Sequence, residues 1–152
     1  MLGRTHGGGR GLLRRRLRLP LTGVAGCASS RGPSGPLLAE DEGLIALDVE
    51  AMLHGFGCQV VGPLSELEDI LLAIQAQPLY GALLDVNLRG RHVFDILPEF
   101  IERKIPVVLT SGYDDASMFP HAFRELPRIS KPFDESTLLR VCTTTLGAAL
   151  AV

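Results

Sequence analysis

Five polar side chains stand directly after apolar stretches of the chain, and their types could support phosphoryl chemistry. Glu40 and Asp41 follow a short apolar run, Asp85 ends a longer one, and two later runs end at a hydroxyl and an amine, Ser111 and Lys131. A carboxylate at the end of a buried strand is unfavourable unless it has partners. Three acids, a hydroxyl and an ammonium gathered on one rim would be partners for one another.

The chemistry of such a rim follows from its charge. Clustered carboxylates repel unless a cation neutralises them, and an all-oxygen site with open positions suits Mg²⁺. Asp85 would then be a nucleophile that accepts a phosphoryl group covalently. Lys131 would hold the phosphoryl oxygens as a fixed ammonium, and Ser111 would donate a hydrogen bond to one of them. Taken singly, these residues could equally be helix caps, turn formers or solvated strand ends, so the hypothesis depends on their joint placement.

An alternation of apolar runs and helical patterns predicts the frame that would bring these residues together. Five alternations of strand and helix indicate a parallel sheet with right-handed crossovers and helices on both faces. In open α/β sheets, ligands bind outside the carboxyl ends of the strands, which is where all five side chains would lie. We expect strands at 37–39, 58–62, 79–85, 105–111 and 127–131, and helices at 44–56, 65–77, 93–103, 114–125 and 136–146.

Local features carry more specific predictions. In the first helix, one apolar stripe is expected to face the core. It runs through Leu44, Leu47, Ala51 and His54 or Gly55, and is widened by Ile45, Val49, Met52 and Phe56. Pro36 shortens the first strand because proline cannot donate to a ladder. Ser65 is the expected cap of the second helix.

Further along the chain, residues 87–91 are expected to form a loop. The helix at 93–103 should be irregular near Pro98, and the one at 114–125 should be short and broken by Pro120.

The net charge of −2 conceals an asymmetry. Residues 1–36 contain seven arginines and no acid, whereas residues 37–152 carry a charge of −9. We predict a disordered Arg/Gly-rich tail over 1–36 and a folded domain over 37–149. The acidic domain argues against duplex DNA as a partner, and no apolar run approaches the ~20 residues that span a bilayer.

The basic tail has other interpretations. It could be an organellar transit peptide, a lipoprotein signal ending at Cys27, an upstream misread of the start, or a segment that touches RNA or anionic lipid. The three cysteines show no disulfide framework and no zinc spacing, so Cys58 and Cys142 are expected to be free thiols in a reducing cytosol.

The polar residues, taken in order, resemble those of a CheY-like response-regulator receiver domain. Glu40–Asp41 follow the first strand, Asp85 the third, Ser111–Gly112 the fourth and Lys131–Phe133 the fifth. The resemblance covers about residues 37–147. It implies a flavodoxin-like, doubly wound, five-stranded parallel sheet of strand order 2-1-3-4-5, in a stand-alone, single-domain response regulator of bacterial type.

The resemblance also implies roles for individual residues. Asp85 would be phosphorylated by a phosphohistidine on a sensor histidine kinase or a histidine phosphotransfer protein. Asp41, Asp85 and the backbone carbonyl of Asn87 would bind Mg²⁺ directly, and Glu40 would act through water. Ser111 would swing toward the phosphoryl group and so reshape the protein-binding face.

One departure concerns the position three residues before Lys131, which is often an aromatic switch in this family and is Arg128 here. The leading hypothesis is nevertheless a cytoplasmic phosphorelay receiver, not an enzyme, that signals to an unknown downstream protein or drains phosphate from a relay. One alternative is an unphosphorylated receiver-like interaction module. Another is a metal-dependent aspartyl-phosphate phosphatase; haloacid dehalogenase-like enzymes usually have a second acid two residues after the nucleophile, where this chain has Asn87.

Overall fold

The protein alternates strands and helices along most of its length. Its structure, a computed structural model, describes residues 35–112 and 116–150. In chain order the elements are β1 (Leu37–Ala39), α1 (Gly43–Gly55), β2 (Val61–Leu64), α2 (Leu67–Ala76), β3 (Ala82–Asp85), β4 (Asn87–Leu88), β5 (Arg91–His92), the 3₁₀ turn η1 (Val93–Asp95), α3 (Leu97–Glu102), β6 (Val107–Ser111), the 3₁₀ turns η2 (Ala116–Met118) and η3 (His121–Phe123), β7 (Arg128–Ser130) and α4 (Glu135–Leu150).

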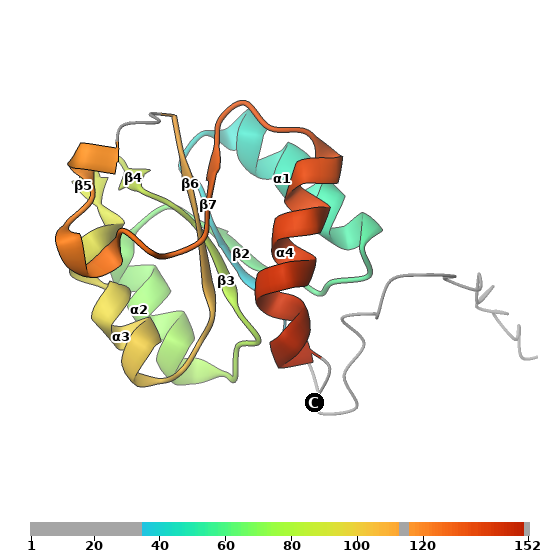
Figure 1. The fold of residues 1–152 in the computed structure, drawn as a ribbon. Helices are drawn as coiled ribbons and strands as arrows, with labels where there is room; N and C mark the ends of the chain where they lie inside the picture. Colours follow the sequence, from blue (N-terminus) through green and yellow to red (C-terminus); the bar gives the residue numbers. More distant parts are fainter. Residues whose placement is uncertain (1–34, 113–115, 151–152) are drawn as a thin grey trace, which may run out of the picture.

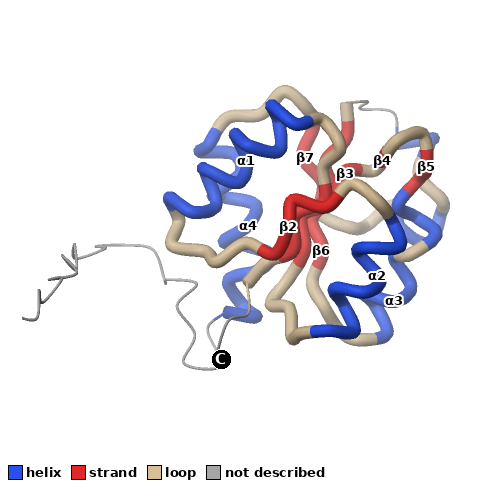
Figure 2. The backbone as a smooth tube through the Cα atoms, turned by 180° about the vertical axis from the view of Figure 1, so that it is seen from behind, coloured by secondary structure: helices blue, strands red, loops and turns tan. Residues whose placement is uncertain are grey.

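Five strands form one parallel sheet in the order β2-β1-β3-β6-β7, which confirms the predicted strand order. Helices α1 and α4 cover one face of this sheet, and α2 and α3 cover the other (Figures 1 and 2). Parallel neighbours need crossover connections. Helices α1, α2 and α3 lie in the first three, and the described part of the connection from β6 to β7 contains the turns η2 and η3. The carboxyl ends of the strands therefore meet at one edge of the sheet.

The central strands are buried on both faces, and alternate side chains serve two cores. Leu37 and Ala39 of β1 belong to the core under α2 and α3, whereas Leu38 belongs to the core under α1 and α4. In β3, Leu84 and Leu83 divide in the same way. This division follows from the two-residue period of a strand and explains the continuous apolar run that precedes Asp85.

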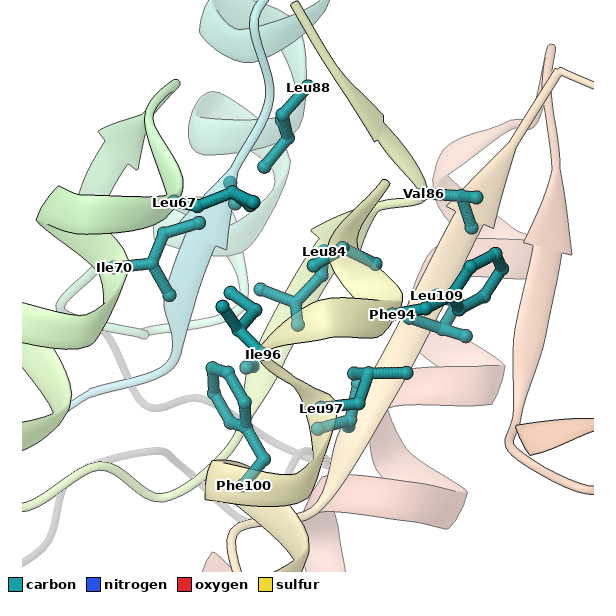
Figure 3. Close-up of a cluster of buried hydrophobic side chains, with 14 of the residues drawn as sticks. Leu67, Ile70, Leu84, Val86, Leu88, Phe94, Ile96, Leu97, Phe100 and Leu109 are labelled. Atoms are coloured by element: carbon teal, nitrogen blue, oxygen red, sulfur yellow. The ribbon is translucent and has the colours of Figure 1, made fainter. Parts of the chain in front are cut away.

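The core under α2 and α3 is the larger of the two described clusters (Figure 3). Ile70 of α2 and Phe100 of α3 are both fully buried there and close over the sheet residues Leu84 and Leu109. The 93–103 segment is irregular as predicted, because η1 precedes α3 and Pro98 stands in the first turn of α3, where a missing N–H is tolerated.

Strand β1 is short, yet it lies inside the sheet. The N–H of Leu37 donates to the carbonyl oxygen of Gly81 (3.0 Å), and the Pro36 carbonyl accepts from the N–H of Val61 (3.0 Å). Pro36 thus stands just before the strand and contributes an acceptor, so its missing N–H does not interrupt the ladder.

The predicted second strand was wrong by about three residues. Strand β2 covers Val61–Leu64 and includes Pro63, although residues 58–62 were expected. β2 is the edge of the sheet, where proline is tolerated, and the register shifts between Leu37 and Ala39. The residue that precedes α2 is Glu66 rather than the expected Ser65, and its side chain makes no capping bond.

The inward face of α1 differs in part from the prediction, which included Val49 but centred on Leu44 and Leu47. Its buried residues are Ala46, Val49 and Leu53, whereas Leu44 and Leu47 are 85% and 63% exposed. The segment carries two apolar stripes, so periodicity alone does not choose between them. The stripe through Leu44 also contains Asp48 one turn later, and burying it would desolvate an unpaired carboxylate.

Residues 87–92 form a hairpin rather than the expected loop. Strands β4 and β5 pair antiparallel, with Asn87 opposite His92. The two connecting residues, Arg89 and Gly90, both have positive φ (51° and 79°), as a tight two-residue hairpin turn requires.

The end of the domain departs from the prediction in part. The helix expected at 114–125 is represented, among the described residues, by the separate three-residue turns η2 and η3. Helix α4 covers the predicted 136–146 and continues into the Ala-rich end as far as Leu150. No helix in the described part of the chain is long and apolar enough to span a membrane.

The two cysteines within the described residues differ in state. Cys142 is buried and free, as expected, and burial raises the pKa of its thiol to about 11. Cys58 is disulfide-bonded, so the expected free thiol there was wrong. Sequence spacing does not show which cysteines a fold brings within bonding distance. The predicted tail over 1–36 also lies outside the described residues, except for Gly35 and Pro36, and stays a prediction.

The orientation of α1 can be tested with one substitution at two positions. Leu53→Ala should lower the free energy of unfolding by about 2–5 kcal/mol, because Leu53 is 1% exposed and its loss leaves a cavity. Leu47→Ala should change it by no more than about 0.5 kcal/mol. Urea unfolding measures both, and equal losses would contradict the assigned face.

Candidate functional site

The five polar residues singled out in the sequence meet at the carboxyl edge of the sheet. β1 and β3 pair with Ala39 beside Leu84, so the residues that follow, Glu40 and Asp85, stand level on neighbouring strands. β6 and β7 likewise pair Ser111 with Ser130, which places Lys131 just beyond. A pocket of about 480 Å³ opens at this edge, and its lining includes Asp41, Asp85, Asn87, Ser111 and Lys131.

The three carboxylates form a compact group. One oxygen from each of Glu40, Asp41 and Asp85 lies within 4.8 Å of the others. Glu40 and Asp85 are buried (5% and 6% exposed), and Asp41 is half-buried. Such a group is strongly repulsive unless positive charge stands beside it.

Lys131 supplies that positive charge. Its Nζ donates to Oε2 of Glu40 (2.6 Å) and to Oδ2 of Asp85 (2.8 Å). Its backbone N–H donates to the carbonyl oxygen of Ser111 (2.7 Å), which fixes the start of the side chain at the pocket. One ammonium therefore bridges the ends of β1 and β3 from the far side of the sheet.

These contacts shift the titration of both partners. Burial raises the pKa of Glu40, and the negative charge of Asp85 adds to this, against hydrogen bonds from Lys131 and from the N–H of Glu42. For Lys131, burial opposes the charged form, but the bonds to Asp85 and Glu40 outweigh it and raise its pKa. At neutral pH the lysine is therefore held firmly protonated between the two acids.

The β4–β5 hairpin closes the site from another side. The N–H of Asn87 donates to Oδ1 of Asp85 (3.2 Å), and the N–H of Arg89 donates to Oδ2 of Asp41 (2.9 Å). The N–H of Gly90 donates to Oδ1 of Asn87 (2.9 Å). The sequence prediction missed the contact from Arg89. Gly90 indicates a turn, but an arginine before it does not indicate the second positive φ of a two-residue hairpin.

Two exposed ion pairs join this hairpin to the start of α2. Arg89 lies 2.6 Å from Glu66, and Arg91 lies 2.6 Å from Glu68. Exposed pairs of this kind add little stability. They do orient the hairpin, and with it the backbone of Asn87.

The oxygen donors at this edge fit a divalent cation. Three carboxylates and one ammonium leave two negative charges, which one divalent ion would balance. Val93 donates its N–H to the carbonyl of Val86 (2.9 Å). Because hydrogen-bonded and non-hydrogen-bonded pairs alternate in an antiparallel ladder, the Asn87–His92 pair is non-hydrogen-bonded and leaves the Asn87 carbonyl free of the ladder. An all-oxygen set suits Mg²⁺.

Fold and site together define a flavodoxin-like α/β domain with an acidic pocket and a lysine at the carboxyl edge of its sheet. A solution structure of SdrG from Sphingomonas melonis Fr1 matches it at 30% identity and a TM-score of 0.64, over 78% of this chain and 97% of SdrG. A second SdrG structure, in the BeF3-activated conformation, matches at 31% identity and a TM-score of 0.62, over 76% of this chain and 94% of that one. The chain belongs to the CheY-like response-regulator receiver family.

Other comparisons agree with this assignment. The transcriptional regulatory protein PdtaR of Mycobacterium tuberculosis is 25% identical over 122 residues; the match covers 78% of this chain and 60% of PdtaR. The receiver domain of the sensor histidine kinase PA1611 from Pseudomonas aeruginosa, with a magnesium ion in its active-site cleft, shares the fold at 18% identity and a TM-score of 0.64, over 75% of this chain and 98% of that one. No protein-family model matches the chain.

The raised pKa of Glu40 predicts a pH effect on stability. A carboxyl whose pKa is higher in the folded state than its usual 4.5 stabilises the fold below pH 4.5, and this contribution is lost as pH rises through the raised value. Without divalent cations, Glu40→Gln should therefore gain stability relative to wild type as pH rises from 4 to 7. Urea unfolding across this range measures it. Exposed Glu42→Gln is the control, and a constant difference between Glu40→Gln and wild type would contradict the prediction.

Proposed function

We propose that the protein is a phosphorelay receiver that accepts a phosphoryl group on Asp85. The donor is a phosphohistidine on a sensor histidine kinase or a histidine phosphotransfer protein. The observation that carries the proposal is the contact of the Lys131 ammonium with both Asp85 and Glu40, within a group of three carboxylates. In this proposal, Asp85 is the nucleophile, Lys131 the anion clamp and the three carboxylates the cation site of one pocket.

The transfer forms one bond and breaks another. A carboxylate oxygen of Asp85 attacks the phosphorus, and the phosphorus–nitrogen bond of the phosphohistidine breaks. The imidazole keeps the electron pair and takes up a proton. Mg²⁺, held by Asp41, Asp85 and the carbonyl of Asn87, with Glu40 acting through water, would neutralise charge on the phosphoryl oxygens.

Lys131 and Ser111 would then bind the phosphoryl group on Asp85. Nζ of Lys131 already donates a hydrogen bond to Oδ2 of Asp85. The same ammonium would therefore be close enough to bind a phosphoryl oxygen once Asp85 is phosphorylated. Ser111 lines the same pocket, and its hydroxyl would donate a hydrogen bond to a second phosphoryl oxygen. Because Ser111 ends β6 and pairs with β7, its movement would alter the face formed by these strands.

Two relatives support this proposal. SdrG adopts a BeF3-activated conformation, and BeF3⁻ is an analogue of a phosphoryl group on a carboxylate. The PA1611 receiver coordinates magnesium in its active-site cleft. We propose that this chain likewise binds magnesium and carries a phosphoryl group in its pocket. We further propose that it is a cytoplasmic receiver, not itself an enzyme, that signals by protein contact rather than through DNA.

The alternatives fit less well. A haloacid dehalogenase-like phosphatase needs a second acid two residues after the nucleophile, and this position is Asn87, whose amide oxygen accepts from Gly90. An unphosphorylated interaction module would not require a lysine poised between two buried acids.

Phosphorylation of Asp85 is directly testable. Incubation with acetyl phosphate and Mg²⁺ should add one phosphoryl group to the wild type and none to Asp85→Asn, as read by intact mass. The exposed Asp95 provides the matched control, because Asp95→Asn should be phosphorylated like the wild type. No gain in any of the three, with Mg²⁺ binding confirmed, would favour the interaction module.

The cation site makes a separate prediction. Asp41→Asn should weaken Mg²⁺ binding at least about tenfold, because it removes a charged oxygen donor from the site. Isothermal titration calorimetry measures the affinity, and Asp48→Asn on the exposed side of α1 is the control. Equal Mg²⁺ affinity in the wild type and Asp41→Asn would exclude Asp41 as a ligand.

A further inference from the structure

An aromatic cluster lies beside the phosphoacceptor pocket. It consists of His92, Phe94, Phe119 and Phe123. Phe94 meets Phe119 edge-to-face (centroids 5.3 Å apart), stacks on Phe123 (6.1 Å) and meets His92 edge-to-face (5.7 Å). Such geometries are the favourable ones for aromatic pairs.

The cluster joins two walls of the pocket. His92, at the end of the β4–β5 hairpin, lines the pocket on one side. Met118, the last residue of η2, also lines it and is directly followed by the buried Phe119. Whatever fixes Phe119 therefore also fixes the backbone that carries Met118.

Two arginines hold Phe119. The guanidinium carbon of Arg128 lies 4.6 Å from the centre of the Phe119 ring, a cation–π contact. Nε of Arg124 donates to the Phe119 carbonyl oxygen (3.3 Å). Arg128 comes from β7, two residues before Ser130, which pairs with Ser111. Strand β7, which pairs with the proposed switch residue Ser111, therefore also contacts the segment that carries Met118, through Arg128.

We propose that Arg128 is a positioning residue that lengthens the lifetime of the aspartyl phosphate. By holding Phe119, it keeps Met118 at the mouth of the pocket and restricts the approach of water. Met118 is 43% exposed, so its place in the pocket lining depends on the backbone that joins it to the buried Phe119. This inference rests on the proposed phosphorylation of Asp85. At the position where the family often has an aromatic switch, Arg128 instead contacts the aromatic ring of Phe119.

The step that Arg128 would slow is hydrolysis. The oxygen of a water molecule bonds to phosphorus, and the bond between phosphorus and the Asp85 carboxylate oxygen breaks. The carboxylate keeps the electron pair, and the two protons of the water leave on dihydrogen phosphate. Arg128 touches none of these atoms and acts only by holding Phe119.

Decay of the phosphorylated full-length protein tests the proposal. Wild type, Arg128→Gln, Arg128→Lys and Arg140→Ala would be loaded with acetyl phosphate and Mg²⁺ and then desalted into Mg²⁺ buffer, with intact mass followed over time. Arg128→Gln should decay about two- to fivefold faster, the factor that an exposed cation–π contact supports. Arg128→Lys, which keeps a cation, should decay at an intermediate rate, and Arg140→Ala, which removes an exposed arginine of α4, at the wild-type rate.

Two further readouts separate positioning from a general loss of structure. The rate of phosphorylation should be the same in Arg128→Gln and wild type. Because Arg128 is exposed, the midpoint of thermal unfolding should fall by no more than about 6 °C, the shift that loss of one exposed cation–π contact produces. Decay of Arg128→Gln at the wild-type rate, or of Arg128→Lys at the rate of Arg128→Gln, would overturn the proposal. Failure of the wild type to take up phosphate would instead overturn the proposed function.

Discussion

The structure depends most on one ammonium held between two carboxylates. Glu40 and Asp85 are buried at the ends of adjacent parallel strands, and the register of β1 and β3 sets them level. Two such charges are tolerated only when a positive charge stands close to both. Lys131 provides it from the far end of the sheet, within 2.8 Å of each acid. Strand order, strand ends and the geometry of the pocket are therefore tied to one interaction.

The β4–β5 hairpin shows how backbone groups complete this site. Its N–H groups reach Asp85 and Asp41, and its turn is fixed by the left-handed conformations of Arg89 and Gly90. The exposed ion pairs to α2 orient the hairpin without contributing much stability. Backbone N–H groups thus hold the carboxylates of Asp85 and Asp41 in place without a cation, so the pocket is preorganised.

The aromatic cluster gives the pocket a second, apolar side. Arg128 stands three residues before Lys131, where an aromatic residue is common in the family. In the folded protein this arginine lies over the ring of Phe119, so the position still contacts an aromatic ring. The aromatic ring lies in the segment after β6, and the positive charge stands on β7.

The alternation of apolar runs and helical patterns by itself predicted a parallel sheet with helices on both faces. The polar residues that end those runs, among them Glu40, Asp85 and Lys131, predicted the family, and the resemblance to that family implied the strand order. Tertiary structure alone decided which stripe of α1 is buried, since both stripes are apolar and only packing against the sheet excludes Asp48. The tertiary structure also decided the limits of β2, because only an edge strand admits Pro63. It decided the hairpin at 87–92 as well, because an arginine at position 89 does not indicate a positive φ as a glycine would. Such choices depend on contacts between segments distant in sequence, which local pattern does not contain.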